Sequence, residues 1–405
     1  MKITIIGTSN SLVKDGFKDG FNHLDGLSVT NISIGGCSAI QHVERMLSHQ
    51  NLLFESDVVI LDSIVNDLVF SMSDATDITF IMESITAMYQ MAASMNKPVL
   101  SVLFPTKHHL GAISENGIYE HHISECKRLS IAVIDLFSIC RGMQYKELGF
   151  LDGPHISPFF ARSVGEAIGR YCLNSNNFSN FNKHDYLPIN KHVGNYRYSV
   201  RSLIVGADEC EESVTKEKSN SQFSEKLVNI NNPKFIALDN VELLGILQWS
   251  DKNSLDIELK YVANSSESNL VKLKSSDGLL RFTPPYKPLE IHSQFSIGMH
   301  VDSGIRDSGC STNGNIYIKN ILVRSAIYKT DVDANDESLP DNFEYSGRAM
   351  DVTLLDLQIR KQFSMFMLGI KFSLNKMENL KNKLDDDSKD VVGLFLKGLN
   401  ANGES

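Results

Sequence analysis

The chain has 405 residues, of which 42% are hydrophobic and 22% charged, the composition of a soluble globular protein. Its 39 basic and 49 acidic side chains give a net charge of −10, which argues against nucleic acid as a partner, because nucleic-acid binding leaves a basic footprint. The length predicts two or three domains, since single cores rarely grow beyond about 250–300 residues.

Residues 1–178 alternate strand-like and helix-like segments. Short apolar runs read KITIIG, DVVILDSI, KPVLSVLFP and IAVIDLF, and they are separated by helical stretches such as AIQHVERMLSHQNLLF and DITFIMESITAMYQMAASM. This alternation predicts an α/β domain with a flavodoxin-like, three-layer parallel sheet. In such sheets, sites form where the strands end at their carboxyl edge.

A polar, Asn-rich segment over 179–199 reads as a linker, and the pattern then changes. Apolar and polar residues alternate over 255–261 and again over 295–301, and a further long strand is expected over 314–328. Residues 200–330 are therefore predicted to form an antiparallel β-sandwich. The stretch GNIYIKNILV has a short, weak similarity to the closing strand of jelly-roll carbohydrate-binding modules.

An acidic linker over 331–345 precedes a predicted helical tail over 346–405, in which apolar residues recur at helical spacing between Leu354 and Met377. The tail is expected to pack on its own protein or on a second subunit, as in a homo-oligomer. Binding to a membrane surface is the less favoured alternative, because the polar face is not strongly basic.

Compartment and metal content are predicted from the cysteines and the apolar runs. The six cysteines lie far apart without a C-x-x-C pair, which favours free thiols in a reducing cytoplasm over disulfides or a metal site. No apolar run approaches 18 residues and the amino terminus has no signal-peptide core, so no transmembrane segment is expected.

Polar motifs follow the predicted strands in order. Gly7-Thr8-Ser9 ends the first strand, Gly35-Gly36 follows the second, Asn66-Asp67 follows the third, and Asp152 and His155 stand three apart in a late loop. Each motif alone has an ordinary structural explanation, such as a helix cap or a turn. Together they supply a nucleophile, a base, an orienting acid and oxyanion donors.

This arrangement resembles the SGNH (GDSL-type) hydrolase superfamily over about residues 1–175. GTSNS matches the Ser block, SIGG the Gly block, VND the Asn block and DGPH the Asp-x-x-His block. The resemblance implies that Ser9 is the nucleophile, His155 the base and Asp152 its orienting acid. It further implies an oxyanion hole formed by the backbone of Ser9 and Gly36 and the side chain of Asn66, with Gly35 as the alternative to Gly36.

Two positions depart from the family pattern. Thr8 stands where an Asp usually precedes the serine, and Ile64-Val65 replaces small residues ahead of Asn66. The first departure is also seen in some sugar O-acetyltransferases of the superfamily. The second is expected to narrow the acyl pocket.

The resemblance implies a serine enzyme that acts on O-acyl esters through an acyl-Ser9 intermediate, as an esterase or a sugar O-acetyltransferase. The appended β domain points to O-acetyl groups of a carbohydrate as the ester, and the expected cytoplasmic location points to surface-glycan biosynthesis. Hydrolysis needs no cofactor, whereas transfer leaves acetyl-CoA open as the acyl donor. The alternative is a non-catalytic carbohydrate-binding protein on a degenerate SGNH scaffold. The pairs His108-His109 and His121-His122 are interpreted as surface or substrate-loop histidines rather than zinc ligands, and Cys37 as a small buried residue.

Overall fold

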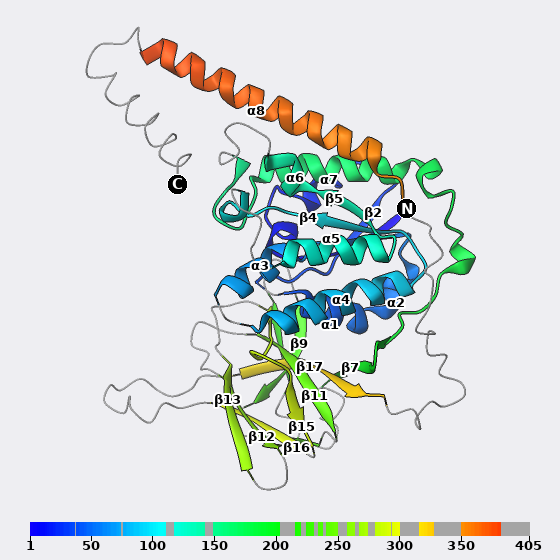
Figure 1. The fold of residues 1–405 in the computed structure, drawn as a ribbon, viewed down its shortest axis with the longest axis vertical. Helices are drawn as coiled ribbons and strands as arrows, with labels where there is room; N and C mark the ends of the chain where they lie inside the picture. The colour runs from blue at the N-terminus through cyan, green and yellow to red at the C-terminus, as the bar shows by residue number, and fades with distance from the viewer. Residues whose placement is uncertain are drawn as a thin grey trace.

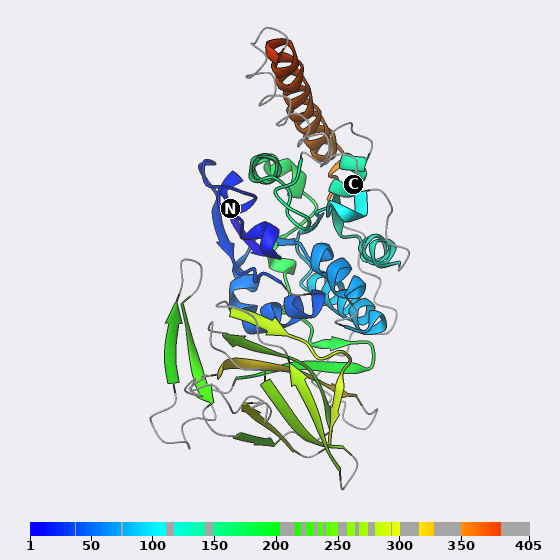
Figure 2. The same cartoon turned by 90° about the vertical axis from the view of Figure 1, so that its left-hand side faces the viewer.

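The computed structural model describes residues 1–36, 38–73, 76–110, 117–141, 149–202, 215–219, 224–230, 234–237, 240–249, 257–263, 267–273, 280–292, 294–299, 316–327 and 350–381. These residues form a parallel α/β domain, a second domain of antiparallel strands and a long carboxyl-terminal helix. The second domain and the long helix lie on opposite sides of the first domain (Figures 1 and 2).

The first domain contains a five-stranded parallel sheet in the order β2-β1-β3-β4-β5. Its strands are β1 (Lys2–Ile6), β2 (Ser28–Asn31), β3 (Val58–Leu61), β4 (Val99–Leu103) and β5 (Ala132–Asp135). Its helices are α1 (Ala39–Ser48), α2 (Gln50–Glu55), α3 (Ile64–Met72), α4 (Ile78–Ser94), α5 (Ile118–Arg128), α6 (Leu136–Arg141) and α7 (Pro158–Leu173). The predicted flavodoxin-like, three-layer α/β fold is confirmed.

Burial along the strands follows from their places in the sheet. Every residue of β3 and β4 is buried, because helices cover both faces of the central strands, whereas the edge strands β2 and β5 keep partly exposed positions. Figure 1 shows α6 and α7 on one side of the sheet and α1, α4 and α5 on the other. The carboxyl ends of β1 and β3 lie side by side, since Ile6 pairs with Leu61.

The second domain contains two antiparallel sheets, as the strand pattern predicts. Its strands are β6 (His192–Val193), β7 (Tyr196–Ser202), β8 (Thr215–Ser219), β9 (Ser224–Ile230), β10 (Lys234–Ala237), β11 (Val241–Trp249), β12 (Ile257–Ala263), β13 (Glu267–Leu273), β14 (Leu280–Thr283), β15 (Leu289–Ile291), β16 (Gln294–Met299) and β17 (Ile316–Ala326). One sheet has the order β10-β16-β12-β13, and the other is built around β14-β11-β17-β7-β6.

The segment 179–199, expected to be a linker, is a linker only in part. Strands β6 and β7 begin before residue 200, and β7 pairs with β17 over its whole length. Tyr186 also packs on the first domain, where the Lys97 ammonium lies 4.6 Å from its ring centroid. The sequence of β7 lacks the apolar pattern of a strand, because few of its side chains are buried.

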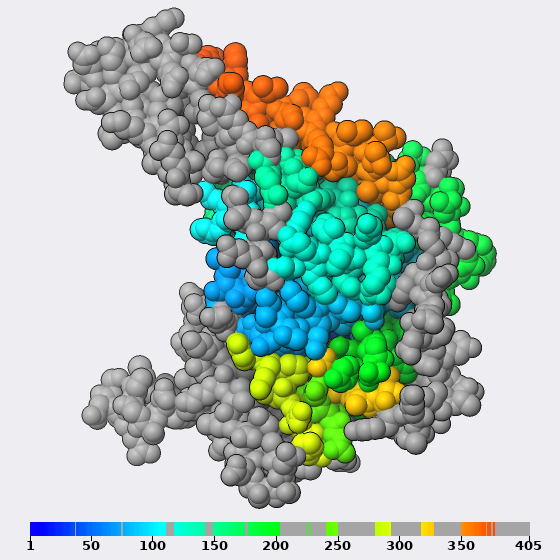
Figure 3. All heavy atoms as spheres, viewed as in Figure 1, coloured from blue at the N-terminus to red at the C-terminus, as the bar shows by residue number. Residues whose placement is uncertain are grey.

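The tail forms helix α8 (Thr353–Lys381), which packs on α7 of its own chain. Leu355, Ile359, Phe363 and Met367 are buried, and the Phe363 ring lies 4.1 Å from that of Phe160 on α7. Figure 3 shows α8 lying over one end of the first domain. The predicted linker over 331–345 and residues 382–405 lie outside the described residues.

Two expectations concern thiols and membranes. Among the described residues, Cys126, Cys140 and Cys172 are buried free cysteines, and burial raises the pKa of the Cys126 and Cys172 thiols to about 12. Thiols that are so difficult to ionise are poor nucleophiles and metal ligands. None of the helices in the described part of the chain is long and apolar enough to cross a membrane.

Candidate active site

The turn after β1 is fixed by hydrogen bonds to the buried carboxylate of Asp62, which directly follows β3. Asp62 Oδ2 accepts hydrogen bonds from the Thr8 N–H at 3.1 Å, the Thr8 hydroxyl at 2.8 Å and the Ser11 hydroxyl at 2.9 Å. Gly7 is required here, because a Cβ at this position would lie 2.3 Å from Ser11 Oγ. The turn therefore holds Ser9, half-buried, at the carboxyl end of the sheet.

Ser9 forms a hydrogen-bonded row with the two late-loop residues that the sequence singles out. Its Oγ lies 2.7 Å from His155 Nε2, and His155 Nδ1 lies 2.8 Å from both carboxylate oxygens of Asp152. Because a carboxylate only accepts, this geometry places a proton on Nδ1 and leaves Nε2 to accept from Ser9. The Asp152 side chain is 50% exposed and the His155 side chain 22% exposed.

The loop that carries His155 is tied directly to the serine turn. Asn10 Nδ2 donates to the Pro154 carbonyl oxygen at 3.1 Å, and Asn10 Oδ1 accepts from the Ile156 N–H at 3.2 Å. Asn10 is 1% exposed, so water competes little for these bonds. The residue next to the serine thus fixes the loop that carries its histidine partner.

The predicted oxyanion residues come from the loops after β2 and β3. A Cβ on Gly35 would lie 3.6 Å from Ser9 Cβ, so the two-glycine loop borders the serine, and Gly36 adopts a φ of +71°. Asn66 lies in the first turn of α3 and is 7% exposed. Its Nδ2 has no hydrogen-bond partner in the described part of the protein, although buried donors are usually paired.

A buried network joins these two loops. Asp67 Oδ1 accepts from the Ala39 N–H at the start of α1 at 2.7 Å, and Asp67 Oδ2 lies 3.0 Å from His122 Nε2. His122 Nδ1 is in turn 2.9 Å from the Tyr89 hydroxyl. Asp67 and His122 have fully buried side chains, so the network fixes the spacing between the Asn66 turn and the glycine loop.

The four histidines of the two pairs have separate surroundings. His122 is part of the buried network, and the His121 ring nitrogen Nε2 is 2.9 Å from Thr86 Oγ1. His109 is buried against Thr106, and burial lowers its pKa. His108 is exposed. It lies beside the loop that carries Asp152 and His155, since a Cβ on Gly153 would lie 3.2 Å from its Nε2. No three metal-ligating side chains among the described residues gather into a metal site.

Three residues of this site, Asp62, His122 and Asn10, are not marked as site residues by the sequence. Asp62 and His122 bond to partners more than fifty positions away, and Asn10 bonds to Pro154 across 144 positions. The only local signal was polarity at the end of an apolar strand, which Asp62 shows in the run VVILDS. His122 was predicted to lie at the surface or in a substrate loop, and that prediction is wrong, since helix α5 turns it inward toward Asp67.

Asp62 should give the protein a measurable pH dependence of stability. Burial raises its pKa from 3.8 to about 6, so between these values the folded protein holds more protons than the unfolded chain. The free energy of unfolding of wild type relative to Asp62→Asn should therefore fall as pH rises through this window, by up to about 3 kcal/mol, and stay level above it. Urea denaturation of both proteins at several pH values from 4 to 8 checks this, and a difference that is constant with pH would contradict it.

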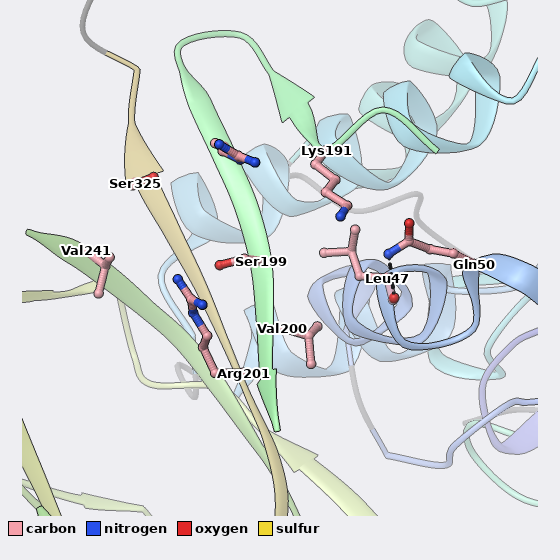
Figure 4. A pocket seen from close by; sticks show the side chains of 9 residues that line it. Leu47, Gln50, Lys191, Ser199, Val200, Arg201, Val241 and Ser325 are labelled. Carbon is pink, nitrogen blue, oxygen red and sulfur yellow. Dashed lines mark hydrogen bonds between the residues drawn. The ribbon is translucent and has the colours of Figure 1, made fainter. Parts of the chain in front are cut away.

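Two pockets at the boundary between the domains lie apart from the predicted site residues, none of which lines either pocket. The first has a volume of about 450 Å³ and lies between β7 and the α1–α2 region. Figure 4 shows Lys191 directed toward Gln50 on one side of β7 and Arg201 on the other side, so these two cations do not converge. The second, of about 590 Å³, lies between the start of α4 and strands β7, β11 and β15.

Comparison with known proteins finds similarity at the level of structure. No family model matches the chain, and no curated protein matches it. Solved structures similar to it include an acetyl xylan esterase, AlAXEase (18% identity, 43% of this chain and 100% of that one, TM-score 0.36), and a lipase/acylhydrolase from Enterococcus faecalis (17%, 46% and 97%, TM-score 0.34). A member of the lipolytic G-D-S-L family from Veillonella parvula is 17% identical, over 43% of this chain and 98% of its own, with a TM-score of 0.32. The likeness is one of fold.

Proposed function

We propose that the protein is a serine esterase or acyltransferase that works through an acyl-Ser9 intermediate. The observation that carries the proposal is the row in which Ser9 Oγ lies 2.7 Å from His155 Nε2 and His155 Nδ1 lies 2.8 Å from Asp152. A serine hydroxyl is a weak nucleophile unless an adjacent base removes its proton, and this row supplies the base and the group that orients it.

The reaction follows from these contacts. His155 Nε2 takes the Ser9 proton while Oγ attacks the acyl carbon, and the carbonyl electron pair moves onto oxygen. When this intermediate collapses, the bond to the alcohol breaks and His155 gives its proton to the leaving oxygen. Water, or a second hydroxyl, then attacks the acyl carbon with His155 again as base, the bond from that carbon to Ser9 Oγ breaks, and His155 returns the proton to Oγ.

The developing oxyanion needs donors that are already in position. We assign this role to the backbone N–H groups of Ser9 and Gly36 and to Asn66 Nδ2. The buried Nδ2 of Asn66 has no partner among the described residues, which supports this assignment. A donor that bonds only to the oxyanion is expected to be unpaired in the free protein. A Cβ on Gly35 would lie 3.6 Å from Ser9 Cβ, which supports a donor from this glycine loop, either Gly36 or its alternative Gly35.

We further propose that the acyl group is an acetyl group on a carbohydrate hydroxyl, in the synthesis of a surface glycan. The sequence resemblance to SGNH enzymes and the appended antiparallel sheets support this choice. Hydrolysis requires no cofactor, whereas transfer to a sugar would take its acetyl group from a donor such as acetyl-CoA.

The test is release of p-nitrophenol from p-nitrophenyl acetate by wild type and by Ser9→Ala, with and without acetyl-CoA and a mixed sugar acceptor. Ser9-dependent release without acceptor identifies an esterase, and release of free CoA only with sugar present identifies a transferase. If the folded wild-type protein is inactive in every arm, the proposal is wrong and a non-catalytic carbohydrate-binding protein is the better account.

A further inference from the structure

Helix α1, which follows the glycine loop, is buried from both sides. Nine of its ten residues are buried, including the polar Gln41, Glu44 and Arg45. The parallel sheet covers one side and the second domain the other (Figure 2). Asn320 of β17 donates to Glu44 Oε1 at 3.0 Å, and Arg324 of the same strand pairs with Glu83 of α4 at 2.8 Å. The second domain is therefore fixed against the element that begins at the candidate site.

The second domain also places a side chain at the glycine loop. A Cβ built on Gly36 would lie 3.8 Å from Nη2 and 3.9 Å from both Cζ and Nε of Arg281, which belongs to β14. Three nearly equal distances mean that the flat face of the guanidinium lies over the side of Gly36 that a Cβ would occupy. The preceding glycine borders Ser9, so Arg281 and the serine flank the same short loop.

The charge of Arg281 matters at this place. An arginine stays protonated at any ordinary pH, and its planar fork matches the two oxygens of a carboxylate. The protein as a whole carries a net charge of −10, which disfavours the approach of anions. The positive charge of Arg281 lies beside the Gly35-Gly36 loop. It would offset this repulsion for a substrate that carries a negative group near that loop.

We propose that Arg281 is a substrate-binding residue that selects acetyl esters of sugars carrying a carboxylate, such as uronic acids. The proposal rests on the esterase or acyltransferase function above and adds the charge of the substrate. It makes the second domain part of the active site, because β14 supplies the guanidinium while β17 holds the domain on α1 and α4.

Binding to a protein that cannot turn over tests this without relying on catalysis. Calorimetry compares an O-acetylated methyl glucuronoside, with its carboxylate ionised, with the matching O-acetylated methyl glucoside. Ser9→Ala should bind the anionic ester about 10- to 100-fold more tightly than the neutral one, as expected for a charge-assisted hydrogen-bonded pair. Ser9→Ala/Arg281→Gln should lose that preference.

The matched control is Ser9→Ala/Arg201→Gln, which removes the same charge from an exposed position on β7 and should keep the preference. Equal affinity of Ser9→Ala for the two esters, including no measurable binding of either, would overturn the proposal, and so would a preference that survives Arg281→Gln. Hydrolysis of the same esters by wild type is scored separately. A binding preference without turnover would keep Arg281 as an anion-binding residue while refuting the catalytic function.

Discussion

Replacing either Ser9 or His155 by alanine is expected to lower kcat for ester hydrolysis by about 10,000-fold or more. The two side chains share one hydrogen bond of 2.7 Å and act in the same step, so each is of little use without the other. The double variant should therefore be no slower than the slower single variant, because groups that act as a unit are not additive. Steady-state kinetics of all three with p-nitrophenyl acetate measures this.

Asp152→Asn provides an internal comparison for this prediction. Its carboxylate lies 2.8 Å from His155 Nδ1 but is 50% exposed, so water can partly replace it. We expect a smaller loss of kcat than for His155→Ala.

The Ser9/His155 double variant gives the contradicting outcome for the first prediction. If the losses of the two single variants multiply in it, the two residues act independently, which would contradict the hydrogen-bonded pair assigned to them.

Removing the Asn66 amide should lower kcat by about 100- to 1,000-fold, the usual effect of losing one oxyanion donor. Asn66→Ala removes the donor and should show this loss, whereas Asn66→Asp should lose at least as much, because its carboxylate also repels the developing oxyanion. KM should change much less than kcat, since the bond forms only as charge develops on the oxygen.

The stability of the Asn66 variants separates catalysis from folding. Asn66 Nδ2 has no partner in the described residues of the free protein, so deleting it breaks no hydrogen bond of the fold. The free energy of unfolding of Asn66→Ala, measured by urea denaturation, should stay near that of wild type. A loss of activity that is matched by a large loss of stability would indicate a structural role instead.

The sequence predicts those strands and site residues that are marked by a pattern among neighbouring residues. Buried strands such as Val58–Leu61 are marked by apolar runs, and the serine, glycine, asparagine and histidine motifs follow the strands in order. Parallel pairing then brings the carboxyl ends of β1 and β3 together, which is why the sequence alone predicts Ser9 at the edge of the sheet.

Contacts across long sequence separations could not be predicted in the same way. Nothing near Asn10 in the sequence points to Pro154, yet Asn10 holds the loop that carries this proline. Arg281 is one of many charged residues in the β region, and only the packing of β14 brings it to Gly36. Strand β7 begins inside the predicted linker, because a strand with few buried residues lacks the apolar pattern that marks the others.

The most direct test of the central claim is labelling by a fluorophosphonate, which reacts irreversibly with serine hydroxyls that a neighbouring base activates. Peptide mapping of the labelled wild-type protein is expected to place the label on Ser9, and labelling should drop sharply in the folded His155→Ala variant. A wild-type protein that stays unlabelled, or that is labelled at Ser11 or elsewhere but not at Ser9, would contradict the account.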